Sequence, residues 1–215
     1  MSTLLLETIQ RIVREELARQ RTAELAVIQE QHPHATDGDD DNYACTVVLR
    51  DTGLVLRRVP VATQAIGAAS IPAVGELVLV AFVGGDLNAP VIVGRLYNDE
   101  DRPPVNGDGR SVLHLPLGAA DDEAVHLEVH SGDRREVALT LGSGLALTLR
   151  DDDPVVELIV DGGKATLAID RDGAVRLETS GDLSIEAGKV GIKGSEITVE
   201  ASGTLDLKGA TINLN

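Results

Sequence analysis

The sequence is poor in cysteine and in aromatic residues, and each shortage narrows the structures it can form. Its 215 residues include a single cysteine, Cys45, so no disulfide can form within the chain. There are only three aromatic residues, Tyr43, Phe82 and Tyr97, and together they span less than a third of the sequence. Because aromatic side chains dominate most cores, we expect the one conventional globular core in this part of the chain.

Basic residues are also scarce, with 19 Lys and Arg against 35 Asp and Glu and a formal net charge of −16. Residues 31–42 carry four Asp and no Lys or Arg, and residues 111–170 carry twelve acidic and four basic residues. Such an acidic surface disfavours nucleic-acid backbones and anionic membranes as partners. No apolar run approaches the length of a membrane span, and the N-terminus lacks the pattern of a secretory signal.

Residues 171–215 contain a short internal repeat. Pairs of apolar residues at positions i and i+2 recur at steps of 8, 7, 7, 8 and 7 residues, with glycines between them. Alternation of apolar and polar residues is typical of half-buried strands, and a fixed period indicates a stack of equivalent strands. The pairs are Val175/Leu177, Leu183/Ile185, Val190/Ile192, Ile197/Val199, Leu205/Leu207 and Ile212/Leu214.

One copy of this repeat cannot form a core, because each unit offers only two medium-sized apolar side chains. Three copies wound about a common axis bring the pairs together and satisfy strand edges that a lone chain leaves open. We therefore predict an intertwined triple-stranded β-helix, a trimeric prism, over residues 105–215. It is wide over residues 111–170 and regular over residues 171–215. The alternative is a single-chain β-solenoid, whose repeats usually run to about 20 residues, too long for this period.

The rest of the chain is predicted to be an N-terminal helix followed by a polar linker. An amphipathic helix is predicted over residues 3–30, within an N-terminal segment 1–31. Its apolar stripe consists of Leu5, Ile9, Ile12, Val13 and Leu17, and resumes after a lapse with Leu25 and Ile28. Such a helix can pack on its own domain, bundle with symmetry mates or dock into a partner. An acidic linker follows at residues 32–42.

Residues 43–104 are predicted to form a small five-stranded barrel of the OB type, which makes the protein mainly β. Short strands alternate there with turn-forming segments, and no strong helical pattern appears. The expected strands are Cys45–Leu49, Leu54–Val61, Glu76–Val83 and Val91–Leu96. Looser strands are expected farther on, at His126–His130, Val137–Leu141, Leu145–Leu149, Val155–Val160 and Thr166–Ile169.

The stretch 71–98 resembles the OB-fold of phage baseplate assembly protein V and of VgrG spike proteins. That pattern reads Pro-x-Val-Gly-x-x-Val-x-Val-x-Phe, then Gly-Asp with a later Pro, then Val-x-Gly-x-Leu-Tyr-Asn. The matching residues are Pro72, Gly75, Phe82, Gly85, Asp86, Pro90, Gly94, Tyr97 and Asn98. A shorter stretch, 149–173, looks like the start of the triple-stranded β-helix of this family, so the resemblance covers about residues 43–215.

The resemblance implies a structural role, as the trimeric central spike of a contractile tail or injection machine. The chain lacks room for the large hub domain of VgrG proteins, so it looks like the shorter protein V, with a separate baseplate hub protein on its N-terminal side. Some short phage spikes carry a His-x-His metal site at the tip, but here no histidine follows His130 and the sequence ends bluntly at residues 212–215. The resemblance therefore implies a separate PAAR-type tip protein. The spike is expected to assemble in the cytoplasm without a signal peptide and to contact the target membrane transiently.

Two other functions stay open at this point, and neither involves catalysis. One is an OB-fold module that binds nucleic acid, which needs a basic groove and stacking aromatics. The other is a trimeric fibre that binds a receptor or glycan, which needs a distal knob. The charge balance argues against the first, and the repeat that runs to the end of the sequence argues against the second.

No catalytic, cofactor or metal site is predicted, so the protein is not expected to be an enzyme. His32 and His34 form a His-x-His pair, but on the expected linker and without a third ligand. His126, Glu128 and His130 share one face of a strand. Threefold symmetry could gather them into a site, but we interpret them as an exposed polar face.

Overall fold

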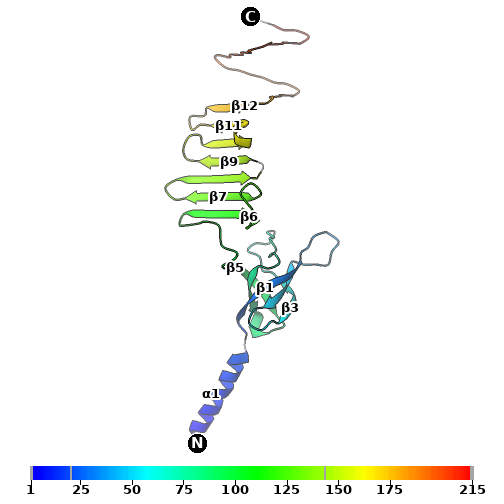
Figure 1. The fold of residues 1–215 in the computed structure, drawn as a ribbon, viewed down its shortest axis with the longest axis vertical. Helices are drawn as coiled ribbons and strands as arrows, with labels where there is room; N and C mark the ends of the chain where they lie inside the picture. Colours follow the sequence, from blue (N-terminus) through cyan, green and yellow to red (C-terminus); the bar gives the residue numbers. More distant parts are fainter. Residues whose placement is uncertain (1, 20, 143, 214–215) are drawn as a thin grey trace.

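The computed structural model describes residues 2–19, 21–142 and 144–213 of an elongated chain. A helix, α1 (Ser2–Arg19), lies at one end and is followed by a compact barrel. Beyond the barrel, short strands lie across the long axis of the molecule and stack along it (Figure 1). Residues 180–213 wind away from the last strand toward the other end.

The barrel has five antiparallel strands in the order β3-β2-β1-β4-β5. The strands are β1 (Ala23–His32), β2 (Ala44–Leu49), β3 (Val55–Pro60), β4 (Leu77–Phe82) and β5 (Pro90–Leu96). A parallel bridge between Val61 and Ile92 joins the two outer strands and closes the barrel. The four strands expected from the sequence are confirmed as β2 to β5, with ends that shift by at most one residue.

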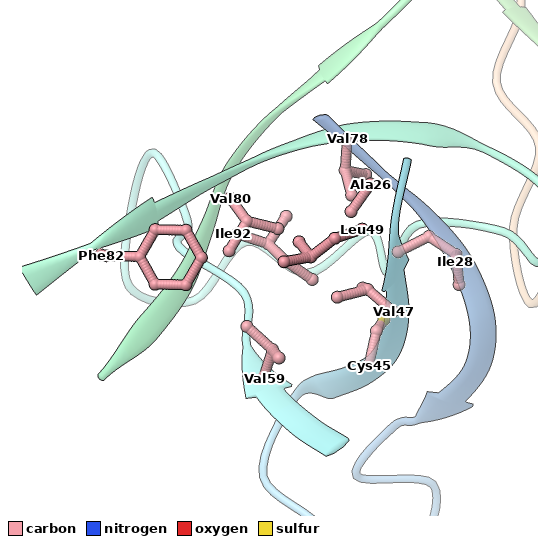
Figure 2. Packing of buried hydrophobic residues seen from close by; sticks show 10 residues of the cluster. All are labelled: Ala26, Ile28, Cys45, Val47, Leu49, Val59, Val78, Val80, Phe82 and Ile92. Carbon is pink, nitrogen blue, oxygen red and sulfur yellow. The ribbon is translucent and has the colours of Figure 1, made fainter. Parts of the chain in front are cut away.

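The barrel encloses the hydrophobic core, which is aliphatic apart from one aromatic ring and one thiol (Figure 2). The buried cluster consists of Ala26, Ile28, Cys45, Val47, Leu49, Val59, Val78, Val80, Phe82 and Ile92. Phe82 alone of the three aromatic residues belongs to it. Tyr43 lies at the rim, where its hydroxyl accepts a hydrogen bond from the Ser70 N–H at 2.9 Å, and Tyr97 is 59% exposed.

The prediction of one helix over residues 3–30 is wrong in its second half. The helix ends at Arg19, and Ala23–His32 forms β1, which pairs with both β2 and β4 at the centre of the barrel sheet. Ala, Glu, Leu and Gln in this stretch favour a helix, but two sheet neighbours and the burial of Ala26 and Ile28 outweigh that preference.

The acidic linker predicted at residues 32–42 is a loop inside the barrel. His32 pairs directly with Ala44, so the chain turns back between β1 and β2 rather than joining two domains. The Asp39 carboxylate organises the loop by accepting hydrogen bonds from the backbone N–H groups of Ala35 and Thr36 at 2.7 and 2.8 Å. This second error follows from the first. Because β1 was predicted as part of a helix, the loop of the β1–β2 hairpin was predicted as a linker between two domains.

A second sheet of seven antiparallel strands follows the barrel, and each strand pairs with its neighbours in sequence. The strands are β6 (Arg110–Leu115), β7 (Val125–Ser131), β8 (Arg135–Leu141), β9 (Leu145–Arg150), β10 (Val156–Val160), β11 (Ala165–Ile169) and β12 (Val175–Thr179). The five strands predicted from His126 to Ile169 are confirmed as β7 to β11. The strand β6 was not among the expected strands.

The strands of the second sheet pair within one chain, which corrects the expectation of intertwined strands for residues 110–179. For residues 180–213 the intertwined β-helix stays a prediction. The sheet also includes β12, so the change in architecture falls after Thr179 rather than at residue 171. Residues 180–213 form no helix or strand of their own and are exposed throughout. We call residues 110–213 the shaft, and residues 180–213 its tail.

Candidate functional site

One face of the seven-stranded sheet carries a column of leucines, one from each strand. Residues directly opposite each other in an antiparallel pair lie on the same face, so the pairing register identifies the column. Leu113 pairs with Leu127, Leu127 with Leu139, and the series continues without a break to Leu177. The column consists of Leu113, Leu127, Leu139, Leu147, Leu158, Leu167 and Leu177.

Two further columns flank the leucines on the same face, because side chains of a strand alternate between faces with period two. One flank consists of Ser111, Val129, Val137, Leu149, Val156, Ile169 and Val175. The other consists of Leu115, Val125, Leu141, Leu145, Val160, Ala165 and Thr179. Only Ser111 and Thr179, both on end strands, are polar. We call these three columns the apolar face.

The apolar face has no second layer over it within the described part of the chain. Substantial contacts of each shaft strand are confined to its sheet neighbours and to the short turn η2 (Asp161–Gly163). Leu113, Val125 and Leu149 are 47%, 43% and 43% exposed. Domains are normally built from at least two packed layers around a core, so a single sheet with an open apolar face is an incomplete structure.

The total accessible surface area also indicates that much of the chain is uncovered. Its accessible area is 16539 Å², whereas a compact monomer of 22.6 kDa exposes roughly 9,500 Å². The excess lies mainly in α1 and the shaft, because the buried core belongs almost entirely to the barrel. Most of the hydrophobic surface outside the barrel is therefore without a partner in a single chain.

The tail keeps its apolar pairs exposed, as an unpartnered chain must. Exposed fractions run from 48% at Ile212 to 73% at Ile192. Eleven of the twelve residues expected at a trimer axis are described, namely Val175, Leu177, Leu183, Ile185, Val190, Ile192, Ile197, Val199, Leu205, Leu207 and Ile212. Val175 and Leu177 lie on the apolar face of the sheet, and the other nine lie in the tail. Leu214, the twelfth, lies outside the described residues.

The opposite face of the sheet is polar and is crossed by ion pairs between neighbouring strands. Arg110 on β6 lies 2.5 Å from the Glu128 carboxylate on β7, and Arg150 on β9 lies 2.6 Å from Glu157 on β10. The Arg110 guanidinium lowers the pKa of Glu128 to about 2, with smaller contributions from His126 and His130. A polar face of this kind is suited to contact with water, whereas the apolar face is suited to contact with another apolar surface.

The polar face also gathers histidines, including one that the sequence did not single out. His126, Glu128 and His130 share this face as expected, and His130 Nε2 lies 2.5 Å from a Glu128 oxygen. His114 joins them from β6, with its Nδ1 3.1 Å from Nδ1 of His126. The alternation in Val112-Leu113-His114-Leu115 was the sequence signal that could have placed His114 on the polar face of a strand. Among the described residues, no group of three or more His, Cys, Asp or Glu side chains is arranged to hold a metal ion.

The histidines of the barrel do not form a site. His32 Nε2 lies 2.9 Å from the Thr46 hydroxyl, and His34 Nδ1 lies 3.0 Å from Asp39. The two side chains therefore have separate partners. The structure does not bring them together.

The residues of the OB motif shape turns and close the core of the barrel. The carbonyl of buried Pro72 accepts a hydrogen bond from Gln31 at 2.7 Å, and Gly75 (φ +94°) donates its N–H to Ile28 O at 2.9 Å. Phe82 is in the core, and Gly85 has φ +79° in the turn η1 (Val83–Gly85).

The remaining motif residues complete the β4–β5 hairpin and the exit from the barrel. The Asp86 carboxylate accepts from Asn88 N–H at 2.9 Å, and Pro90 and Gly94 lie in β5. The Asn98 side-chain oxygen accepts two backbone N–H groups at 2.7 Å in the turn after Tyr97. The contacts of the motif residues thus form turns and part of the core of the barrel.

The helix α1 extends away from the barrel and packs on no other element of the described chain to a substantial extent. Ile9, Ile12 and Val13 on its apolar stripe are 49–51% exposed. Of the three roles open from the sequence, packing on its own domain is not the one seen. No helix of the described chain is long and apolar enough to span a membrane.

The barrel matches a known family. A family model described as the type VI secretion system/phage-baseplate injector OB domain matches residues 22–97. The matched range runs from just before β1 to just after β5. No curated protein matches the chain.

The match confirms the resemblance to baseplate protein V and VgrG, and it independently assigns β1 to the barrel. The chain therefore carries an OB domain of a family found in phage baseplates and secretion-system injectors, which points to a structural component of such a machine. The match ends before the shaft.

Proposed function

We propose that the protein is the central spike of a contractile tail or injection machine and works as a homotrimer. The match of residues 22–97 to the injector OB domain supports a place in such a machine. The observation that carries the trimer is the column of seven leucines on a sheet with no second layer. Catalysis has no part in this function.

Three copies related by a threefold axis cover the apolar face without any further protein. Each sheet presents its leucine column to the axis, and the three sheets form the sides of a triangular prism with the polar faces outside. The columns run along the direction in which the strands stack (Figure 1), so contact continues over the whole length of the sheet. Sheets pack face to face at about 10 Å, which leaves space for one layer of interdigitated leucines.

In the tail the same copies wind around one another. The outer edge of β12 is free, and the tail continues from it with apolar pairs at a period of 7 or 8 residues. Pairing between copies satisfies the backbone groups of that edge and of the tail, which a lone chain leaves to water. The prism thus begins as three preformed sheets and ends as an intertwined triple-stranded β-helix.

The mechanism is mechanical. A rod whose strands are all paired, either within or between copies, has no loop at which it can hinge. Contraction of the sheath drives this rod through the target envelope, with transient membrane contact at its tip. On this proposal α1, with its exposed apolar stripe, faces a baseplate hub protein, and a PAAR-type tip protein covers the C-terminal end of the tail.

The proposal is tested by placing a charge on the apolar face. Leu147→Lys puts an ammonium group at the centre of the leucine column, where the trimer excludes water. We expect the discrete three-chain species to disappear in light scattering after size exclusion, because an unpaired charge buried in an apolar interface is strongly unfavourable. A trimer of unchanged mass contradicts the assignment of the face.

The matched control is Thr148→Lys, one residue along the same strand. Thr148 lies on the polar face and pairs across with Glu157, so a lysine is accommodated there in water beside an opposite charge. This variant is expected to keep the mass of the unmodified protein. Loss of the trimer in both variants contradicts the assignment of inner and outer faces.

A further inference from the structure

Two histidines on the polar face lie with the same atoms facing each other. His114 on β6 and His126 on β7 are direct cross-strand neighbours, and their Nδ1 atoms are 3.1 Å apart. The ring centroids are 5.4 Å apart with the planes at 70°. The His126 side chain is 26% exposed, so the pair is open to solvent and to small ions.

The outer nitrogen of each ring already has an oxygen partner. Nε2 of His114 lies 3.0 Å from the backbone carbonyl of Ala119, and a carbonyl only accepts, so this nitrogen carries a hydrogen. Nε2 of His126 lies 3.4 Å from a carboxylate oxygen of Glu128, whose other oxygen lies 2.5 Å from Arg110 Nε, and a carboxylate paired with a guanidinium accepts hydrogen bonds.

Both neutral rings therefore hold their hydrogen on Nε2, which leaves a lone pair on each Nδ1. Two lone pairs at 3.1 Å repel unless an electrophile lies between them. A carbonyl or carboxylate on the outer N–H is also the usual support of a histidine that binds a metal, because it fixes the tautomer and the ring orientation.

The separation of the two Nδ1 atoms suits a single ion. At metal–nitrogen distances of about 2.0–2.1 Å, two ligand atoms 3.1 Å apart subtend an angle of roughly 100° at the metal. That angle lies between the square and tetrahedral values, so the remaining positions are free for water. Imidazole nitrogen is a preferred ligand of zinc, nickel and copper.

The surroundings add negative charge to the site. Residues 116–124, which supply the Ala119 carbonyl, include the run Asp121-Asp122-Glu123. This loop lies close against the sheet, because a Cβ added at Gly142 falls 1.9 Å from the Asp122 carbonyl oxygen. Local acidic charge raises the concentration of cations near the histidine pair.

We propose that His114 and His126 form a two-histidine site for a divalent transition-metal ion of the zinc class, with Glu128 and the Ala119 carbonyl as its supporting shell. The bound ion joins β6, an end strand of the sheet, to β7 and to the loop 116–124. All these groups belong to one chain, so the site does not depend on the trimer or on the proposed function.

The test is a calorimetric titration of the full-length protein with Zn²⁺ at pH 8, where imidazole side chains are ordinarily neutral. One Zn²⁺ per chain is expected, and either His114→Ala or His126→Ala is expected to abolish the heat of binding. Glu128→Gln keeps an oxygen near His126 but removes the charge, and it is expected to weaken binding by about 10-fold or more. Circular dichroism of each variant checks that the shaft is folded.

Two control variants make the assignment specific. His32→Ala removes the histidine at the end of β1, and His34→Ala removes the exposed histidine of the barrel loop. Both are expected to bind Zn²⁺ as the unmodified protein does. Absence of Zn²⁺ binding by the folded, unmodified protein overturns the proposal and leaves a shared proton between the rings. Binding that survives His114→Ala, or that is lost with either control, overturns it as well.

Discussion

The barrel and the shaft are both built from short alternating strands, yet only the barrel buries its apolar side chains. Ten hydrophobic residues form the closed core of the barrel, whereas among the described shaft residues the buried hydrophobic ones are Ala124 and Ala168. The barrel closes through the contact between β3 and β5, so one chain supplies both sides of its core. The shaft sheet stays open, with one edge at β6 and the other at β12.

The difference shows that topology, rather than hydrophobicity, decides whether a β region covers its own apolar face. The leucine column of the shaft is as apolar as the core of the barrel. A meander whose strands pair only with their sequence neighbours has no strand that returns to cover its own face. On the proposed function, such a region gains its hydrophobic stabilisation by association with further copies of the chain.

The largest expected effect is on the tail. Replacing Ile197 and Leu205 together with Asp places six carboxylates at the proposed trimer axis, and we expect the intertwined tail to be lost while the barrel stays folded. Light scattering reports the trimer, and the cooperative unfolding transition reports the barrel. The control pair is Thr198→Asp with Thr204→Asp, at the adjacent outward positions, which is expected to remain trimeric. A trimer with an intact tail in the Ile197 and Leu205 variant contradicts the axial assignment.

A large effect on stability is expected from truncating a side chain in the core of the barrel. Leu49→Ala truncates a side chain that is 0% exposed, and a buried leucine truncation of this kind costs about 2–5 kcal/mol of the free energy of unfolding. Urea unfolding of the barrel transition measures it. Leu54→Ala, at a position 38% exposed, is the matched control and is expected to cost much less. Equal effects at the two positions mean that the barrel core is wrongly placed.

A smaller effect is expected where the shaft does have a close internal contact. Gly142→Ala drives a Cβ into the Asp122 carbonyl, so the loop 116–124 has to shift away from the sheet. Overpacking typically costs about 1–3 kcal/mol, and here the cost falls on the shaft and not on the barrel. Gly132→Ala, where nothing lies within 4 Å of the added Cβ, is the control. Hydrogen exchange of residues 116–124 distinguishes the two, and identical protection in both variants contradicts the contact.

The smallest expected effect concerns the loop between β1 and β2. Hydrogen bonds from backbone N–H groups, that of Thr36 foremost, lower the pKa of the Asp39 carboxyl from 3.8 to about 2. A depressed carboxyl pKa stabilises the folded loop above pH 3.8, and this contribution is lost as the pH falls toward 2. We expect the loop to open in acid while the barrel stays closed, which carboxyl-resolved NMR titration measures. A titration midpoint for Asp39 at or above 3.8 contradicts the loop geometry.

The sequence predicted strand positions well, because alternation and turn residues are local signals. β7 to β11 and β2 to β5 lie where the pattern placed them, within one or two residues. β1 was missed because Ala23-Glu24-Leu25-Ala26 favours a helix, and only its two strand neighbours, β2 and β4, make it a strand. Pairing with strands that are distant in the sequence leaves no local pattern from which β1 could be predicted.

The register of the shaft could not be predicted either. Seven leucines fall in one column only because each hairpin has the length that brings them opposite one another, and a slip of one residue turns a strand over. The sequence shows the leucines but not the hairpin geometry. The same limit hid the pair of His114 and His126, since their contact follows from the pairing of β6 with β7.

The most direct test of the central claim is the absolute mass of the full chain in solution, by light scattering after size exclusion. The claim is that the shaft is an unfinished structure completed by two further copies. It predicts a mass three times 22.6 kDa for an elongated particle. A monodisperse monomer at micromolar concentration, with the shaft folded, contradicts the claim, because a single chain then keeps its apolar face in water.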